Sequence, residues 1–388
     1  MQFGIDAISF YTSQYYLDLQ TLAAARSAAP TKFSDELGQY RMSVAPPGED
    51  SITMAANGVD ELLADKDASE IELIIFATES GVDAAKSAAT HIHGLLNLPK
   101  RCRSVEVKQA CYGVTFGLQM ALAWLQQNEK KQALLIASDI ARYGLRTAAE
   151  PSQGCGAVAM LLSANPRLFA IDGQAGFCTR ETMDFWRPNY LDYALVDGRL
   201  SCDAYMRLAE ESFGQYSALN GRSLSDHDRF CYHMPIARLV ESTHRRLARV
   251  SSLSKELCEH QIRDGLIYGR EIGNCYNASL YLGMVSLLEN SSDDLSGKLI
   301  GLYSYGSGSV AEFFSARVVQ GYRDHLPRQH TGKMLKLRKE LSLDDYERWH
   351  RFQLPTSGEN FEFSEKWNTG KFRFKGICNH QRIYERFG

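Results

Sequence analysis

Short apolar runs and helical periodicities alternate along the chain. The runs are four to eight or so residues long, as in buried strands, whereas the helical stretches repeat apolar residues every three or four positions. The predicted strands are 71–78, 132–138, 157–163 and 298–304, and the clearest predicted helices are 51–65 and 278–290. This alternation indicates an α/β architecture with mostly parallel, covered sheets.

Three pairs of segments recur in the same order in the two halves of the chain. For example, "GCGAVAMLLS" and "GSGSVAEFFS" share two Gly, Val, Ala and Ser at matching places. The pairs are 73–80 with 229–235, 110–125 with 273–288, and 154–163 with 306–315. Three collinear matches predict a duplicated α/β unit.

The repeat suggests a division of the chain. We expect a first half over 1–165, an aromatic-rich inserted crossover over 166–205, and a second half over 206–388. From about residue 332 the chain has a charged helical pattern and then "GKFRFKGICNHQRIYERF", which predicts a closing hairpin. We expect this tail to cover the second half.

Composition narrows the class of protein. The chain has 388 residues, 44% hydrophobic and 23% charged, with a net charge of −3. This gives no reason to expect nucleic acid or an anionic membrane as partner. No apolar run approaches the roughly 18 residues of a membrane span, and the N-terminal residues do not have the pattern of a signal peptide. We therefore expect a soluble, cytoplasmic protein.

The nine cysteines have no spacing typical of a disulfide framework and suggest reduced thiols. The chain has no CxxC pair, and its ten histidines form no HExxH motif. We therefore expect no metal site.

Cys111 stands between an alternating stretch, "RSVEV", and a helical run that begins at Val114. The first turn of a helix offers free backbone N–H groups and the positive end of the helix dipole, and both stabilise a thiolate. This position suits a nucleophile that forms a thioester. The alternative is a buried structural thiol.

Three further polar residues occupy strand ends or helix starts, where α/β folds place ligands. Glu79 follows the apolar run 71–78, and partial burial there would raise its pKa towards the range of a general base. His233 ends the matching strand of the second half, and Asn274 matches the position of Cys111. The alternatives are a helix-cap neighbour or solvated charge for Glu79, a structural hydrogen-bonding role for His233, and a helix cap for Asn274.

The glycine-rich "YGSGSV" (305–310) lacks the lysine and the spacing of a phosphate-binding loop. Its glycines permit close backbone approach, so that a backbone N–H near Ser307 could contribute to an oxyanion hole.

Together these segments resemble the 3-hydroxy-3-methylglutaryl-CoA synthase family of the thiolase superfamily, in its compact bacterial form. The resemblance covers nearly the whole chain. It is carried by "ATESGVDAAKSAATHIHGLL", "KQACYG", "EPSQGCGAVAM", "DFWRPN", "LVDGRLS", "HMP", "GNCYNASLY" and "YGSGSVAEFFSA". It implies a five-layered αβαβα sandwich built from a duplicated βαβαβ unit, in an enzyme that is usually a homodimer.

The resemblance also implies roles. Cys111 would accept the acetyl group of acetyl-CoA, Glu79 would remove a methyl proton, and His233 would polarise or protonate the oxygens of acetoacetyl-CoA. Water would then free the product. Backbone N–H groups of Cys111 and Ser307 would form the oxyanion hole. The acyl groups would be positioned by Asn274 and Tyr143. The substrates are coenzyme A thioesters, and no further cofactor or metal is implied.

The chain departs from the family pattern in places. Arg238 stands where family members often carry lysine, and with Arg245 and Arg246 it could bind the phosphates of coenzyme A. The alternative for the latter two is a solvated helix face. Cys155 and Cys275 are expected to be packing thiols that add oxidative sensitivity near the site.

Three competing functions can be weighed. Some synthases of this family install β-methyl branches on polyketides, using thioesters bound to an acyl carrier protein, and "EVKQACYG" and "THRRLARV" resemble that branch. The mevalonate-pathway enzymes are matched more closely by "ARYGLRTAAEPSQG" followed by "DFWRPNYLDYALVDGRLS". Ketoacyl synthases and thiolases lack a base equivalent to Glu79, and a silent scaffold would be expected to have lost one of Cys111, Glu79 and His233.

Overall fold

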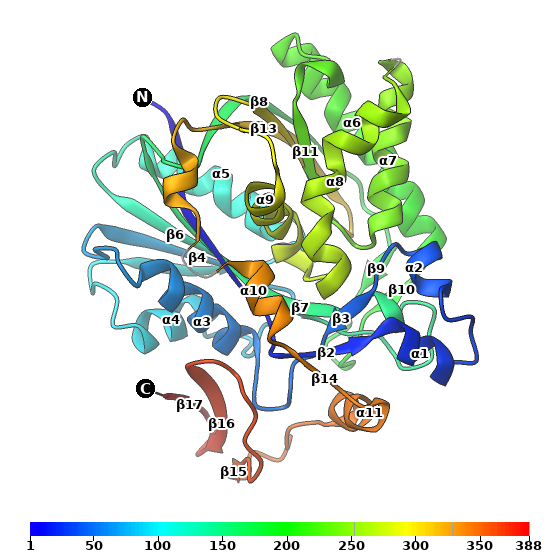
Figure 1. Cartoon of the computed structure of the whole chain (residues 1–388). Coiled ribbons are helices and arrows are strands. Elements are labelled where there is room, and N and C mark those ends of the chain that lie inside the picture. The colour runs from blue at the N-terminus through cyan, green and yellow to red at the C-terminus, as the bar shows by residue number, and fades with distance from the viewer. Residues whose placement is uncertain (252, 328–329, 388) are drawn as a thin grey trace.

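The structure is a computed structural model that describes residues 1–251, 253–327 and 330–387. A nine-stranded sheet runs through it in the order β11-β12-β13-β8-β1-β7-β6-β4-β5 (Figure 1). Its strands are β1 (Phe3–Tyr11), β4 (Ile71–Ala77), β5 (Arg103–Val107), β6 (Gln132–Ala141), β7 (Gly154–Ala164), β8 (Phe169–Thr179), β11 (Arg229–Tyr232), β12 (Leu299–Gly306) and β13 (Val310–Val318).

The sheet consists of two equivalent halves that meet where β1 pairs antiparallel with β8. Outward from this junction, the order β1-β7-β6-β4 on one side matches β8-β13-β12-β11 on the other. β5 extends the first half, and the described residues of the second half add no strand at that place. The three predicted sequence repeats fall on equivalent elements, so the predicted duplication is confirmed.

Strand direction differs in part from the prediction. β5, β4 and β6 are parallel, as are β11 and β12, but β7 and β13 run antiparallel to both of their neighbours. Only residues 307–309 separate β12 from β13. A link of that length can form a hairpin but not the crossover that parallel strands need. An apolar run looks the same in either direction, which is why the pattern did not reveal this.

The helices form the remaining layers. They are α1 (Leu19–Ala25), α2 (Lys32–Glu36), α3 (Ser51–Leu63), α4 (Ala88–Leu95), α5 (Gly113–Leu125), α6 (Gly198–Asn220), α7 (Ala237–Val250), α8 (Lys255–Ile272), α9 (Ser279–Asn290), α10 (Thr331–Lys336) and α11 (Leu343–Arg351), with 3₁₀ turns at Glu150–Ser152, Leu224–Asp226, Tyr276–Ala278 and Tyr322–His325. α3 and α4 pack on the first half of the sheet, α6 packs on the second, and α5 and α9 lie between the two. The predicted five-layered αβαβα sandwich is therefore confirmed.

The central helices are held close to the strands. In α5, Gly117 lies so near the sheet that an added Cβ would come within 2.9 Å of both Ile75 and Leu135. Thr115 of α5 and Tyr281 of α9 share a hydrogen bond of 3.0 Å between their hydroxyls. The Thr115–Tyr281 bond joins the two halves, because α5 belongs to the first and α9 to the second.

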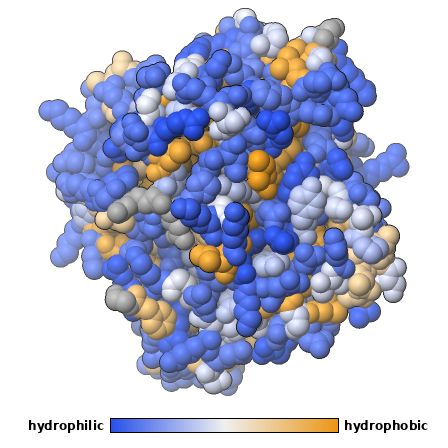
Figure 2. Space-filling model, viewed as in Figure 1, coloured by the Kyte–Doolittle hydropathy of each residue, from blue (hydrophilic) through white to orange (hydrophobic). Residues whose placement is uncertain are grey.

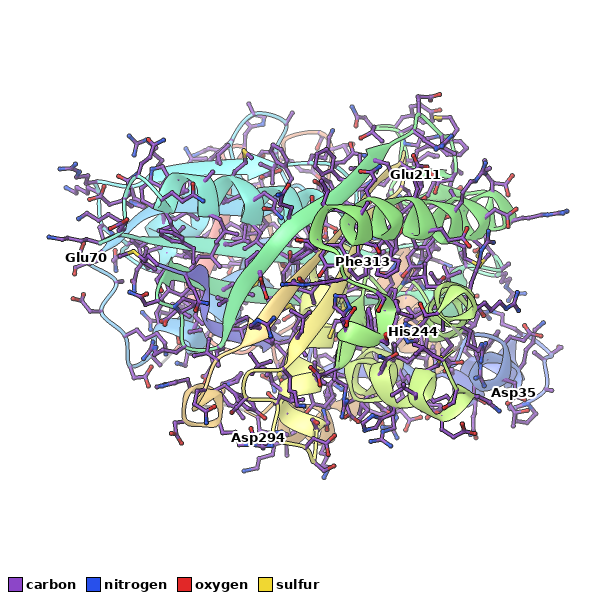
Figure 3. All side chains as sticks on the ribbon, turned by 90° about the horizontal axis from the view of Figure 1, so that it is seen from above. Asp35, Glu70, Glu211, His244, Asp294 and Phe313 are labelled. Atoms are coloured by element: carbon purple, nitrogen blue, oxygen red, sulfur yellow. The ribbon has the colours of Figure 1, made fainter. Side chains whose placement is uncertain are left out.

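On the second half, α6 lies across β8 and β13, as Figure 3 shows from above. Phe313 of β13 packs beneath it against Phe213, with ring centroids 5.0 Å apart. α6 ends at Gly221, whose φ of 63° lies in the left-handed region that favours glycine.

The segment predicted as an inserted crossover, 166–205, contains β8, which pairs with β13 and β1. This part of it therefore belongs to the main sheet. The rest includes the two-residue strands β9 (Phe185–Trp186) and β10 (Leu195–Val196), which pair with each other. The domain boundaries at 165 and 206 remain predictions.

The tail begins on the second half, where α10 packs on α9 and Arg338 donates to Glu271 O of α8 at 3.0 Å. Its later part, with α11 and the closing hairpin, packs on the first half instead, so the prediction that the tail covers the second half is wrong for this part. Its closing hairpin is formed as predicted, by β16 (Phe372–Cys378) and β17 (Gln381–Arg386), with β15 (Phe361–Glu362) beside β16. Asn57 of α3 accepts the backbone N–H groups of Lys371 and Phe372 through Oδ1, at 2.7 and 3.3 Å. These hydrogen bonds to a buried side chain fix the tail on α3. A third small sheet, β14 (Lys339–Glu340), β2 (Tyr15–Asp18) and β3 (Arg41–Ser43), joins the tail to the N-terminal region.

The face of the molecule seen in Figure 2 is mostly hydrophilic, with small, separated hydrophobic patches. In the described part of the chain, no helix is both long and apolar enough to cross a membrane. Among the same residues, no group of three or more His, Cys, Asp or Glu side chains is placed to hold a metal ion.

Candidate active site

Cys111 and Glu79 touch at the edge where β4 and β5 end. Cys111 lies between β5 and α5, with Tyr112 as the residue that caps the helix, and Glu79 follows β4 by two residues. The Cys111 thiol donates a hydrogen bond of 2.9 Å to Glu79 Oε1. The two residues that sequence analysis placed at neighbouring strand ends therefore form one proton-sharing pair.

Burial sets the protonation of this pair. Burial, with the nearby Asp139 carboxylate, raises the pKa of Glu79 to about 8. Burial and the Glu79 carboxyl together raise the pKa of the Cys111 thiol well above its usual value. The expected stabilisation of a Cys111 thiolate by the helix N-terminus is therefore outweighed in the resting site. The proton stays on sulfur, and Glu79 is the group placed to take it.

Asp139, near the end of β6, holds Glu79 in place, and sequence analysis missed it. Its Oδ1 accepts the backbone N–H groups of Glu79 and Ser80 at 2.7 and 3.0 Å. Its Oδ2 accepts the backbone N–H and side-chain Nδ2 of Asn277 at 3.1 and 3.0 Å. Asn277 Oδ1 in turn accepts the N–H of Val114 in the first turn of α5 at 3.0 Å. An acid directly after the predicted strand 132–138 was the available signal.

A cavity of about 430 Å³ opens above Cys111. The predicted site residues that line it are Cys111, Tyr143, His233, Asn274 and Ser307. Glu79 joins this group through its contact with Cys111. The structure therefore brings together six predicted residues from both halves of the fold.

His233 presents a neutral imidazole to this cavity. It follows β11, where its N–H donates to Tyr303 O at 2.7 Å and its carbonyl accepts the Tyr205 hydroxyl at 2.6 Å. Burial lowers the pKa of His233 to about 3. Nδ1 is buried and has no hydrogen-bond partner among the described residues. An uncharged ring in the cavity lining, on a backbone fixed by two hydrogen bonds, is suited to contacting a ligand oxygen.

Ser307 lies in the hairpin between β12 and β13, against the Cys111 turn. The approach depends on Gly306, because an added Cβ there would come within 2.7 Å of the backbone nitrogen of Tyr112. Asp184, fully buried, anchors the other side of the hairpin. It accepts the Gly308 N–H at 2.9 Å and the Tyr305 hydroxyl at 2.8 Å. Sequence analysis had quoted Asp184 within the "DFWRPN" motif without assigning it a task.

Asn274 acts as a local cap and also faces the cavity. Its Oδ1 accepts the Tyr276 N–H at 2.9 Å and the Ser279 hydroxyl at 3.0 Å. The side-chain oxygen is therefore engaged as a helix cap, which is the alternative role considered for Asn274 from the sequence. The side chain also interacts with the Tyr143 hydroxyl in the cavity wall, where a ligand would meet both.

The three predicted arginines lie on α7, outside the cavity lining. Arg246 forms a two-point ion pair with Glu210, at 2.6 and 2.7 Å, on the exposed surface. Arg238 pairs with Glu241 at 2.8 Å, while its backbone N–H donates to Leu37 O, and Leu37 lines the cavity. Arg245 is exposed and contacts Ser242 at 3.4 Å. Only Arg238 is thus placed close to the mouth.

Cys155 and Cys275 are fully buried. Burial raises the pKa of the Cys155 thiol to about 12 and that of Cys275 well above its usual range. The carbonyl of Cys155 accepts the Thr12 hydroxyl at 2.6 Å. Both thiols are therefore held in the unreactive, protonated form.

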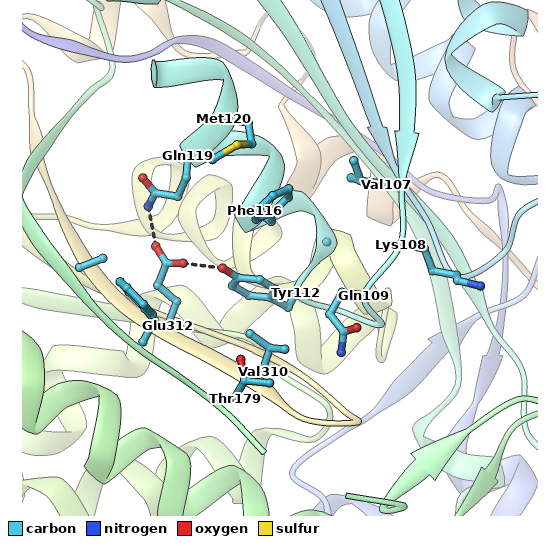
Figure 4. Close-up of a pocket in the computed structure, with 13 residues that line it drawn as sticks. Val107, Lys108, Gln109, Tyr112, Phe116, Gln119, Met120, Thr179, Val310 and Glu312 are labelled. Carbon is cyan, nitrogen blue, oxygen red and sulfur yellow. Dashed lines mark hydrogen bonds between the residues drawn. The ribbon is translucent and has the colours of Figure 1, made fainter. Parts of the chain in front are cut away.

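A second, larger cavity of about 750 Å³ lies beside α5 (Figure 4). Glu312 of β13 binds two side chains there. It accepts the Tyr112 hydroxyl at 2.7 Å and Gln119 Nε2 at 2.5 Å (Figure 4). Because Tyr112 follows Cys111 directly, this buried carboxyl, like Asn277, fixes the start of α5.

A thiol whose proton can pass to an adjacent carboxyl, in a cavity apolar enough to protect a thioester, is suited to carrying an acyl group. On a duplicated five-layered sandwich, this arrangement defines the acyl-transferring condensing enzymes of the thiolase fold.

Comparison with known proteins identifies the family within this class. The family model described as hydroxymethylglutaryl-coenzyme A synthase N terminal matches residues 1–166, and its C-terminal counterpart matches residues 243–353. The chain belongs to the hydroxymethylglutaryl-CoA synthase family.

Three similar proteins show which activities occur among the relatives of this chain. The hydroxymethylglutaryl-CoA synthase of Enterococcus faecalis is 40% identical over 350 residues, covering 89% of this chain and 91% of that protein. The polyketide biosynthesis 3-hydroxy-3-methylglutaryl-ACP synthase PksG of Bacillus subtilis is 34% identical, covering 89% and 87%. A crystal structure of HMG-CoA synthase complexed with CoA superposes with a TM-score of 0.96, at 37% identity and full coverage of both chains.

Proposed function

We propose that this enzyme condenses acetyl-CoA with acetoacetyl-CoA to give 3-hydroxy-3-methylglutaryl-CoA, through an acetyl group carried on Cys111. The observation that carries the proposal is the hydrogen bond of 2.9 Å from the Cys111 thiol to Glu79. The higher identity to the Enterococcus enzyme than to PksG, 40% against 34%, supports free coenzyme A thioesters as substrates.

In the first step, Glu79 takes the thiol proton as sulfur attacks the acetyl carbonyl. The C–S bond to coenzyme A then breaks, and Glu79 returns the proton to the departing thiolate. In the second step, the ionised Glu79 removes a methyl proton from acetyl-Cys111, and the carbon attacks C3 of acetoacetyl-CoA. His233 contacts the C3 oxygen as it gains charge, and the proton held by Glu79 passes to that oxygen to give the hydroxyl. Water then cleaves the thioester at Cys111 and releases the product.

The remaining predicted residues support these steps. Backbone N–H groups of Cys111 and Ser307 would stabilise the oxyanion, since both residues line the cavity. Asn274 and Tyr143 would position the acyl groups from the same lining. Arg238, beside the mouth, is better placed to bind a coenzyme A phosphate than Arg245 or Arg246. No further cofactor is part of the proposal.

The enzyme would act in the cytoplasm and supply the mevalonate pathway to isoprenoids.

We also propose that it is a homodimer. β5 forms the end of the nine-stranded sheet, and apolar side chains on β5, α5 and β8 are exposed nearby: Val105, Phe116, Met120 and Phe177. A second copy placed on this surface would cover them. Light scattering of the purified protein would give the mass of two chains, and a single-chain mass would contradict the dimer.

The second candidate is a polyketide β-branching enzyme that takes acetyl groups from an acyl carrier protein. A groove of about 310 Å³ between α7 and α8 favours it. The groove is lined by Arg238, Arg245, Arg263 and Arg270, among other residues, and Glu241 pairs with both Arg238 and Arg270. This leaves positive charge in excess in the groove, as an acidic carrier protein would require.

One assay separates the two candidates. Loss of the enolate absorbance of acetoacetyl-CoA after addition of acetyl-CoA, with Cys111→Ser as the control, measures condensation of free thioesters. Rapid, Cys111-dependent loss would support the first candidate. Slow loss from protein that still becomes acetylated would contradict it and support the second.

A further inference from the structure

Three aromatic rings from distant segments meet over Cys111. Tyr143 follows β6, Phe185 lies in β9, and Tyr276 opens the 3₁₀ turn before α9. Each pair is arranged edge to face, with ring centroids 6.0 Å apart for Tyr143–Phe185, 6.4 Å for Tyr143–Tyr276 and 5.7 Å for Phe185–Tyr276. The rings therefore form a closed triangle, an arrangement favoured by aromatic side chains.

The triangle is part of the cavity wall next to the thiol. Tyr143 and Tyr276 belong to the same buried cluster as Cys111, with Phe185 packed against it, and all three rings line the cavity. Burial and proximity to Cys111 raise the pKa of the Tyr143 hydroxyl. An acyl group on Cys111 would lie beside this wall.

The backbone around each ring is fixed. Tyr143 donates its N–H to Gln153 Oε1 at 2.9 Å, and its carbonyl accepts His350 Nε2 at 2.7 Å. Tyr276 is held with φ at 45°, a region that costs a bulky residue energy, by its N–H bond to Asn274. Such strain persists only where surrounding contacts impose it, and here it directs a ring from the second half towards Cys111.

Phe185 is fixed from both of its neighbours in sequence. Asp184 is anchored to the β12–β13 hairpin, and Arg187 donates from Nη2 to the carbonyl of Glu79 at 2.9 Å. Phe185 is nevertheless only half-buried and lies in a strand of two residues. Of the three rings, it is the one whose removal disturbs the fold least.

We propose that the triangle of Tyr143, Phe185 and Tyr276 limits the length of the acyl group that Cys111 accepts, with two-carbon acetyl as the group that fits. The inference rests on the proposed function, because it requires acyl transfer to Cys111. A rigid wall cannot yield to added methylenes, and one methylene in an apolar pocket commonly changes the specificity constant by about 10- to 200-fold.

The test compares acetyl-CoA, propionyl-CoA and butyryl-CoA as acyl donors, with acylation followed by intact-protein mass. For the wild-type enzyme we expect the rate to fall at least about tenfold per added methylene. Phe185→Ala should raise the ratio of butyryl to acetyl transfer by at least about tenfold, with Phe185→Leu giving a smaller change in the same direction. Phe363→Ala, a half-buried ring in the aromatic cluster of the tail, is the matched control and should leave the ratio unchanged.

Two results would overturn the inference. One is equal transfer of butyryl and acetyl groups by the wild-type enzyme. The other is an unchanged ratio in a folded Phe185 variant, judged by circular dichroism; should Phe185→Ala not fold, Phe185→Leu decides. Absence of acylation of the wild-type enzyme by any donor would instead contradict the proposed function, and is distinguishable because it does not depend on the variants.

Discussion

Asp139 and Asn277 belong to different halves of the duplicated fold and are joined by two hydrogen bonds, at 3.1 and 3.0 Å, through one carboxylate oxygen of Asp139. The other oxygen holds the backbone of Glu79. One buried carboxylate therefore sets the position of the proposed base relative to the helix that carries the nucleophile.

Asp139→Asn should slow acetyl transfer and condensation by about 10- to 100-fold with little change in KM, because Asp139 positions Glu79 and touches no substrate. Its negative charge also raises the pKa of Glu79, so its loss should shift the acidic limb of the pH–rate profile to lower pH. A purely structural role would slow the reaction without moving this limb, and that result would contradict the assignment.

Cys111→Ser should abolish the acetyl adduct and lower condensation by at least about a thousandfold, since only the nucleophile is removed. Intact mass after incubation with acetyl-CoA measures the adduct, and thermal denaturation checks that the fold is retained. An adduct on the serine variant comparable to that of wild type would sink the assignment.

Glu79→Ala should become acetylated more slowly than the wild-type enzyme, because Cys111 loses the group that takes its proton. It should fail to condense, because the methyl proton has no acceptor. In the wild-type enzyme, condensation requires ionised Glu79 and should rise with pH up to about 8, the pKa of Glu79. Rapid-quench measurements of the two steps separate them. Acetylation of Glu79→Ala at the wild-type rate would contradict the role of Glu79 in the first step, and retained condensation would contradict its role in the second.

Glu49 provides a test of stability against pH. Burial raises its pKa to about 7, against 4.5 in the unfolded chain. A raised folded pKa means that the protonated form is favoured on folding, so the stability it contributes is complete below pH 4.5 and is lost as pH rises towards 7. Glu49→Gln should retain the Tyr11 hydrogen bond and remove this loss, stabilising the enzyme at pH 8 by up to about 3 kcal/mol. An equal effect of the substitution in urea titrations at pH 4 and pH 8 would exclude ionisation as the cause.

Asn57 connects the tail to α3. Beside the two bonds that Oδ1 accepts, its Nδ2 donates to Thr369 O at 2.7 Å. Asn57→Ala should lower the free energy of unfolding by about 2–3 kcal/mol because it leaves buried backbone groups unpaired. Asn128→Ala, which removes one bond to Trp124 at 2.8 Å near the surface, is the control and should cost about 0.5 kcal/mol or less. Equal effects of the two substitutions on chemical denaturation would refute the role of Asn57.

Much of the fold was predictable because the spacing of apolar residues shows which positions of a helix or strand are buried. The repeats at 73–80 and 229–235 became β4 and β11, and the closing hairpin formed where its pattern indicated. Periodicity could not predict the direction of a strand or the part of the fold on which a segment packs. β8, whose alternation is interrupted by Gly173 and Gly176, was assigned to an insertion. The later part of the tail was placed on the wrong half because its partners, such as Asn57, are ordinary polar residues of a helix.

The site was predictable to the extent that its residues stand at strand ends. Cys111, Glu79 and His233 were found in this way, whereas Asp139 and Asp184 act through backbone groups of residues distant in sequence, which no local spacing reveals. Tyr276 was missed because an aromatic residue near a helix start has many ordinary explanations, and its positive φ is visible only in three dimensions.

The duplication has a further consequence. Glu79 follows β4, and His233 follows β11, the equivalent strand of the other repeat. Corresponding places in two copies of one unit thus carry side chains of complementary chemistry, a carboxyl in one and an imidazole in the other. Two identical units paired symmetrically would present the same group from both sides. Because the two copies here lie in one chain, each can differ in sequence from the other. The result is a single asymmetric centre in place of two identical ones.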